Sequence, residues 1–415
     1  MDFTRRDFIR AGAAAAVGEK LTPKPFFGLH PFIEANPKAV FIRRTHVAHK
    51  MDAPAKLREG LTLAREIFVP MDRAGVPVTH RIILKPNITT VRGRGPREDN
   101  WGTGTDAQFY EGLIAGLREL GLRKFHFAEA NMYPLWNDHG YMDIHDRLGV
   151  KVNEPERYPR NFRDGDGMTW SKVPDGVIFT RIPHYAPVNE PDTWVMNVAK
   201  WKAHGMCMTQ TVKNEQGMVV SPYQRFCQGW QMVLEPPDYM QPDIHPRAEE
   251  TVKRFFERHI KTFSRYQSRA ELSPIHQEIW AHKTCDNMSA LTRTGLAMVE
   301  GIYGRNGDGF GYGKDIMANV VMFGKDRFRV DLVGLYLSGH EPGNVHLYRI
   351  AKERGLSDTF NPWEVPVYEW KEGRGVPRKL SDFERTPLET YYLRKDGEPA
   401  YHLVNEPFDY DRVRT

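Results

Sequence analysis

The stretch Arg81-Ile-Ile-Leu-Lys-Pro-Asn87 decides the fold, because a short apolar run ends abruptly in a lysine, a proline and an amide. The apolar run, rich in β-branched residues, predicts a buried strand. Pro86 fixes its own φ and biases Lys85 toward an extended conformation, so the strand ends in a defined geometry. Asn87 follows at the carboxyl end of the strand, where it either closes an Asx turn or meets a ligand.

Helices and strands alternate on both sides of this stretch. Apolar periodicity predicts strands at 40–43, 81–84, 124–129, 177–182, 193–198, 296–302 and 319–323. It predicts helices at 54–68, 107–120, 141–148, 247–263, 274–283, 327–337 and 345–354, with Asp106 as the N-cap of the second. Strand-helix-strand order with short connections favours parallel strands joined by helical crossovers. We therefore expect an α/β protein with a mostly parallel sheet flanked by helices.

Shifts in composition divide the chain into five segments. We expect an export leader and linker at 1–35, an α/β half at 36–220, a helical insertion or cap at about 221–292, a second α/β half at 293–373 and a polar C-terminal tail at 374–415. The fold itself is expected to begin near residue 36.

Charge and composition exclude several classes of protein. Lys and Arg number 58 against 53 Asp and Glu, and 40% of the 415 residues are hydrophobic, which is an ordinary globular balance. The positive residues are dispersed, so no nucleic-acid partner is expected. No apolar run reaches the roughly 18 residues of a membrane span, so no transmembrane helix is expected.

The first residues predict an export signal. Thr4-Arg-Arg-Asp-Phe-Ile-Arg10 resembles the twin-arginine export signal, and a small, weakly apolar segment follows it. An ordinary amphipathic N-terminal helix is the alternative. Export by this route predicts a periplasmic or extracytoplasmic protein.

The residues after strand 193–198 carry the most chemistry. We expect a loop there that presents amines, an imidazole, hydroxyls and an amide at the carboxyl end of the strand: Lys200, Lys202, His204, Thr209, Thr211, Lys213 and Asn214. In open α/β sheets, ligands bind beyond the carboxyl ends of the strands. Lysines and short hydroxyl donors there suit a small anionic ligand. A solvated charged loop is about as good an interpretation.

Other candidates lie at the ends of neighbouring strands. Lys85, Asn87 and Glu129 would face the lysine-rich loop across a cleft. His204 is the first candidate for proton transfer, and Lys213 for charge neutralisation or covalent attachment. Glu129 is either a base, a metal ligand or a hydrogen-bond anchor for a loop. Histidine spacing identifies no metal site, so a metal would have to be held by residues from distant segments.

Several motifs together resemble the domain-of-unknown-function family 362. They are Lys200-Trp-Lys-Ala-His204, 209–217, Leu84-Lys-Pro-Asn87, 127–130, 299–301, 308–311, the pair Asp326 and Asp331, and 339–355. Asp is usual in the family where Glu300 stands. The resemblance covers roughly 38–370 and implies no activity, since the family's own is unknown. Some members carry a ferredoxin-like iron–sulfur module, but Cys207, Cys227 and Cys285 include no Cys-x-x-Cys, which argues against a cysteine-ligated cluster.

Two functions remain open from the sequence. The first is an exported enzyme that acts on a small anionic molecule in a cleft lined by lysine and histidine. The alternative is a non-catalytic periplasmic binding or assembly subunit of a redox or envelope complex, with a protein partner or a second copy of the chain. The substrate, the reaction and the identity of any metal or cofactor are not determined by the residues.

Overall fold

The structure is a computed structural model that describes residues 24–89, 100–130, 133–153, 167–220, 223, 235–262, 274–310, 312–390 and 407–413. The expected export signal, Cys227 and most of 221–234 lie outside these residues.

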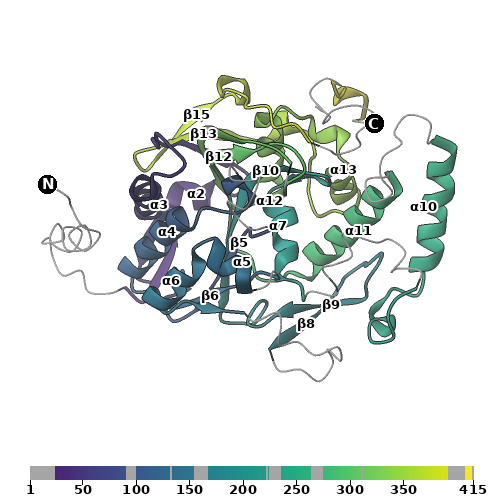
Figure 1. The fold of residues 1–415 in the computed structure, drawn as a ribbon, viewed down its shortest axis with the longest axis horizontal. Helices are drawn as coiled ribbons and strands as arrows, with labels where there is room; N and C mark the ends of the chain where they lie inside the picture. Colours follow the sequence, from purple (N-terminus) through teal and green to yellow (C-terminus); the bar gives the residue numbers. More distant parts are fainter. Residues whose placement is uncertain are drawn as a thin grey trace, which may run out of the picture.

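One large mixed sheet forms the centre of the described chain (Figure 1). Its strands are β2 (Val40–Arg44), β5 (Arg81–Pro86), β6 (Lys124–Phe127), β7 (Lys151–Val152), β10 (Thr193–His204), β11 (Cys207–Thr209), β12 (Leu296–Arg305), β13 (Asp315–Gly324), β14 (Val367–Lys371) and β15 (Arg374–Arg378). They lie in the order β15-β14-β2-β13-β12-β10-β5-β6-β7, and β11 pairs with β10. Strands β11, β13 and β15 run against the others, so the expected mostly parallel α/β sheet is confirmed.

Helices cover both faces of this sheet. One face carries α2 (Pro31–Ala35), α3 (Ala53–Ile67), α4 (Ala107–Glu119), α5 (Tyr133–Asp138) and α6 (Tyr141–Leu148). The other face carries α7 (Thr211–Glu215), α11 (Pro274–Ala290), α12 (Arg327–Leu337) and α13 (His346–Glu353). Alternate residues of each strand enter the two cores: Ile83 packs with the α7–α12 side and Leu84 with the α3–α4 side.

Smaller elements complete the described fold. Strands β1 (Phe26–Leu29), β3 (Phe68–Met71) and β4 (Val76–Pro77) form a second sheet, and β8 (Met168–Lys172) pairs with β9 (Arg181–Tyr185). Helix α10 (Ala248–Thr262) packs against α11 at one end of the molecule (Figure 1). Short 3-10 turns are Trp101–Thr103, Gln216–Met218, Gln241–Asp243, Pro342–Asn344, Pro362–Glu364, Leu380–Asp382 and Asp411–Val413. Within the described ranges, every helix is too short or too polar to span a bilayer.

The structure corrects three local expectations. The expected strand 177–182 is wrong, because the backbone of Val177 and Ile178 donates to Asp286 and the strand begins only at Arg181. The fold begins before residue 36, since β1 buries Phe27 in the core. The first residues of the expected polar tail form β15, paired with β14.

Candidate functional site

Strand β10 continues well past Val198, where the sequence suggested that it ends. Lys200, Lys202 and His204 therefore lie on a strand and not in a loop. Their spacing of two places all three on the α3–α4 face, while Ala199 and the residues between the three polar positions pack into the opposite core. A tight turn at Gly205 and Met206 then leads into β11, whose residue Thr209 pairs with Lys202.

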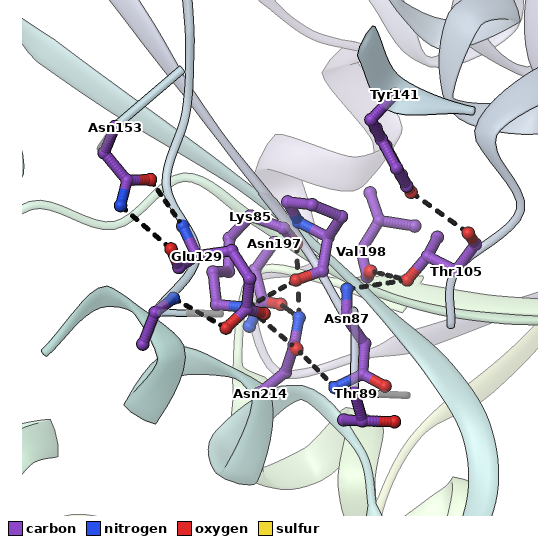
Figure 2. Close-up of polar contacts among 12 residues, drawn as sticks. Lys85, Asn87, Thr89, Thr105, Glu129, Tyr141, Asn153, Asn197, Val198 and Asn214 are labelled. Atoms are coloured by element: carbon purple, nitrogen blue, oxygen red, sulfur yellow. Dashed lines mark hydrogen bonds and ion pairs between the residues drawn. The ribbon is translucent and has the colours of Figure 1, made fainter. Parts of the chain in front are cut away.

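Lys85 and Glu129 form a buried ion pair at the carboxyl ends of β5 and β6 (Figure 2). Lys85 Nζ lies 2.5 Å from Glu129 Oε2 and also donates to Asn214 Oδ1 at 3.0 Å and to the carbonyl of Pro86. Burial lowers the pKa of Lys85 and raises the pKa of Glu129, whereas the charge of each partner opposes the shift of the other. Glu129 thus lies at the carboxyl end of its strand, as predicted, but it is paired with Lys85.

Asn214 on α7 joins this ion pair to the next strand. Its Oδ1 accepts from Lys85 and from Asn87 Nδ2, and its Nδ2 donates to Asn197 Oδ1 at 2.8 Å (Figure 2). Asn197 in turn donates to Glu215, which is paired with Arg327 at 2.7 Å. A continuous polar network therefore runs beneath the α7 face of the sheet.

Gly217 allows α7 to approach the ion pair. A Cβ at this position would lie 2.5 Å from Glu129 Oε1 and 2.6 Å from Lys85 Cε, closer than any real contact. A glycine is therefore required here by packing.

Lys200 belongs to a second buried ion pair on the opposite face. Its Nζ lies 2.7 Å from Glu300 Oε2 and 3.3 Å from the centre of the Tyr303 ring. Tyr303 donates to Asp106 Oδ2, which also accepts from Lys56 at 2.6 Å. Asp106 caps α4 as expected, accepting from the backbone of the first turn. Burial lowers the pKa of Lys200, and the charge of Glu300 opposes that shift.

Lys202 differs from the other two lysines because its partners are neutral. Its Nζ donates to Thr89 Oγ1 at 2.6 Å and to the carbonyls of Thr103 at 2.7 Å and Gly309 at 3.0 Å. A register shift in β12 places Glu300 beside Lys200 but Arg305 beside Lys202. Burial, Lys213 and Arg305 together hold the pKa of Lys202 well below its ordinary value.

His204 and Lys213 are the partly exposed members of the set. The backbone N–H of Met206 donates to His204 Nδ1 at 2.9 Å, which leaves the proton of a neutral ring on Nε2. Burial, Lys213 and Lys202 hold the pKa of His204 well below its ordinary value, so the ring is neutral near pH 7. Lys213, on α7, is therefore close enough to act on both residues electrostatically.

The threonines take different positions. Thr211 Oγ1 lies 2.6 Å from Asp331 Oδ1 and ties the start of α7 to α12. Burial raises the pKa of Asp331 to about 7. Thr209 is fully buried, and its Oγ1 has no hydrogen-bond partner in the described structure; the same holds for Oδ1 of Asn87, which is 5% exposed. Two buried oxygens thus remain unsatisfied by the protein, that of Thr209 on the residue paired with Lys202.

The structure groups the predicted residues into three sets. Lys85, Asn87, Glu129 and Asn214 lie together, Lys200 lies across the sheet, and Lys202, His204 and Lys213 meet at its carboxyl edge. Lys85, Lys200 and Lys202 are fully buried, so they do not line an open cleft as expected.

Several partners were missed from the sequence. The sequence patterns did not identify Glu300, Asn197 and Arg305 as neighbours of the buried polar residues. They also did not identify Asn153, which hydrogen-bonds to the backbone N–H and carbonyl of Glu129. Of these, Asn197 offered a signal, because a polar residue inside an apolar strand requires a buried partner.

Metal ligation finds no support in the described residues, where no group of three or more His, Cys, Asp or Glu side chains could hold an ion. Cys207 and Cys285 are buried and free of disulfides, and burial raises the pKa of both thiols, that of Cys285 to about 12. Neither is a reactive thiolate near neutral pH.

Comparison with known proteins identifies a family. The model of the family described as Domain of unknown function (DUF362) matches residues 82–336, which is more than half of the 415-residue chain. No curated protein and no solved structure matches the chain. The matched range contains β5, β10, α7 and β12, and with them both buried ion pairs and Lys202. The chain belongs to the DUF362 family of domains of unknown function.

Proposed function

We propose that the chain is an exported enzyme that acts on a small anionic molecule bound by Lys202, His204 and Lys213. The observation that carries this proposal is the charge imbalance at Lys202. Lys85 and Lys200 each have a glutamate within hydrogen-bond distance, whereas Lys202 donates only to neutral oxygens. The charges of Lys213 and Arg305 act on Lys202 more strongly than those of Glu129 and Asp308. A bound anion would supply the missing negative charge.

The chemistry of the three side chains suits activation of an oxygen. His204 presents Nε2–H from a neutral ring and can donate to an oxygen on which negative charge develops. Lys213 is placed to neutralise that charge, and Lys202 adds to the positive potential from below. His204 acts in this arrangement as a hydrogen-bond donor, and Nδ1 is already occupied by the backbone of Met206.

Two buried oxygens lack a partner in the described structure, Oδ1 of Asn87 and Oγ1 of Thr209. The Thr209 hydroxyl can donate to an anion, whereas Oδ1 of Asn87 needs an ordered water or a protonated group of the ligand. Lys85, Asn214 and Glu129 then act as the rigid base that positions Asn87.

A binding screen tests the proposal. Thermal shifts are measured with a panel of small carboxylates and phosphates for the wild type, Lys213→Met, His204→Asn and the exposed control Lys38→Met. We expect an anion that stabilises the wild type to lose about tenfold or more in affinity with the first two variants and nothing with Lys38→Met. His204→Asn retains an oxygen for the Met206 N–H and removes only the Nε2 donor. The site is refuted if no anion stabilises the wild type, or if Lys213→Met binds it equally well.

Catalysis and export are tested separately. Binding without turnover of any ligand found would favour the non-catalytic subunit over the enzyme. For export, the motif at Arg5 and Arg6 predicts that Arg5→Lys with Arg6→Lys retains the protein in the cytoplasm. Equal periplasmic amounts of the two forms in cell fractions would overturn the export proposal.

A further inference from the structure

A cavity of about 420 Å³ lies between α10, α11 and the loop that follows β8. Its walls include Arg247, Arg254, Phe255, His282 and Val177. This volume falls in the range of small-molecule sites in proteins. Helices α10 and α11, which contact each other, are at the right of Figure 1.

Arg254 lies on α10 and Arg247 immediately before its first residue, and neither carries an ion pair in the described structure. Arg247, Thr251, Arg254 and Phe255 follow a spacing of four, seven and eight residues, which aligns them along the groove. Arg254 Nη2 makes a hydrogen bond only to Thr251 Oγ1, at 3.2 Å. An ion pair on this helix, between Glu249 and Lys253, lies outside the cavity wall.

An aromatic surface accompanies these charges. The rings of Phe255 and His282 are stacked, with centres 5.0 Å apart and planes inclined by 14°. The stack joins α10 to α11, and both of its residues line the cavity. Flat rings of a ligand pack favourably against such a surface.

The remaining wall is held in place by hydrogen bonds. Asp286 on α11 accepts from the backbone of Val177 at 3.0 Å and of Ile178 at 2.7 Å, and Arg354 balances its charge at 2.7 Å. The carbonyl of Ile178 accepts from the backbone of His245. The cavity is thus formed before any ligand arrives, which reduces the cost of binding.

We propose that this cavity binds a small phosphate monoester that carries a flat aromatic ring. Guanidinium groups match phosphate oxygens in pairs, so Arg247 and Arg254 recognise the phosphate and Thr251 adds a hydroxyl. The ring of the ligand packs on Phe255 and His282. The lining of this cavity includes none of Lys202, His204 and Lys213, and the proposal is independent of the proposed function.

Phenyl phosphate is the probe, and isothermal titration calorimetry on the full chain measures its affinity. Cyclohexyl phosphate and inorganic phosphate separate the contribution of the ring from that of the charge. We expect phenyl phosphate to bind more tightly than either, Arg247→Gln and Arg254→Gln each to weaken it about tenfold or more, and Phe255→Leu to abolish the preference for phenyl over cyclohexyl. The control Arg374→Gln removes an exposed arginine on β15 and leaves the affinity unchanged.

Three outcomes overturn the proposal. They are no binding of phenyl phosphate to the wild type, unchanged affinity in the double variant of Arg247 and Arg254, and loss of binding in Lys213→Met, which would place the ligand at the sheet edge. Urea unfolding midpoints equal to that of the wild type exclude misfolding of the variants. Failure here leaves the anion site at Lys202 untouched, because that site does not depend on Arg247, Arg254 or Phe255.

Discussion

Replacing Glu129 by Gln perturbs the buried ion pair with almost no change in shape. Oε1 can still accept from the Ala130 N–H, but an amide NH₂ replaces Oε2 and faces Lys85 Nζ, which lies 2.5 Å from that oxygen. Two donors then oppose each other, and the buried lysine charge retains only the weaker attraction of Glu215. Breaking a buried pair in this way costs about 3–5 kcal/mol of unfolding free energy.

The pH dependence identifies the cause of that loss. Without Glu129, the pKa of Lys85 in the folded state falls further below its ordinary value, which the unfolded state retains. The unfolded state therefore binds more protons, and the variant regains stability as the pH rises from 7 toward 10, by up to about 1.4 kcal/mol per pH unit. Adding Lys85→Met to Glu129→Gln removes the buried charge and most of this dependence.

Equilibrium urea unfolding at pH 7 and pH 9 measures these differences, and Glu119→Gln is the matched control. Glu119 pairs with Arg65 on the surface, with about half of each side chain exposed, so its loss costs less than about 1 kcal/mol. A cost of Glu129→Gln as small as that of the control would refute the reasoning. So would a cost that does not change between the two pH values.

Three further predictions concern Gly217, Asp331 and His184. Gly217→Ala should cost about 1–3 kcal/mol in urea unfolding, because the new Cβ clashes with the Lys85–Glu129 pair; an unchanged midpoint would contradict this packing. Burial raises the pKa of Asp331 in the folded state to about 7. The folded state therefore holds the carboxyl proton more tightly than the unfolded state, so the contribution of Asp331 to the free energy of unfolding is largest below about pH 4 and falls as the pH rises to 7. The stability of the wild type relative to Asp331→Asn should decline over that window, and a pH-independent difference would be inconsistent with it. Burial lowers the pKa of His184 in the folded state to about 4, whereas the unfolded state keeps a pKa of about 6.5. The contribution of His184 to the free energy of unfolding is therefore lost as the pH falls below about 6.5. NMR titration should find the His184 ring neutral at pH 5.

Local sequence patterns predicted the elements whose signals are local. Helices α6 and α12 begin and end where the apolar periodicity places them, and Asp106 caps α4 as its position before the helix indicated. The end of β5 was predictable for the same reason, since Pro86 terminates the strand by its own covalent geometry. The meeting of Lys85 with Glu129 followed from the rule that parallel strands bring their carboxyl ends to one edge.

Burial of the lysines could not be predicted in this way. A lysine in a strand normally faces solvent, and the free energy of burying it depends on a partner that is distant in sequence. Glu300 lies 100 positions from Lys200, and Asp331 lies 120 positions from Thr211. The alternation of Lys200, Lys202 and His204 with apolar residues was nevertheless a strand signal of period two, and it predicts the continuation of β10 once the lysines are allowed to be buried.

The register shift in β12 then distinguishes the lysines from one another. Without it, β12 residues beyond Glu300 would continue in step with β10, but the irregularity brings Arg305 level with Lys202. Asp315 pairs with Arg305 at 2.8 Å and with Lys50 at 3.0 Å, so its charge is already engaged. Lys202 therefore has no carboxylate within hydrogen-bond distance at the edge where α/β sheets bind ligands, while Lys200, two residues earlier, is paired with Glu300. Because the difference arises from the backbone of β12, exchanging side chains on β10 alone would not make the two positions equivalent.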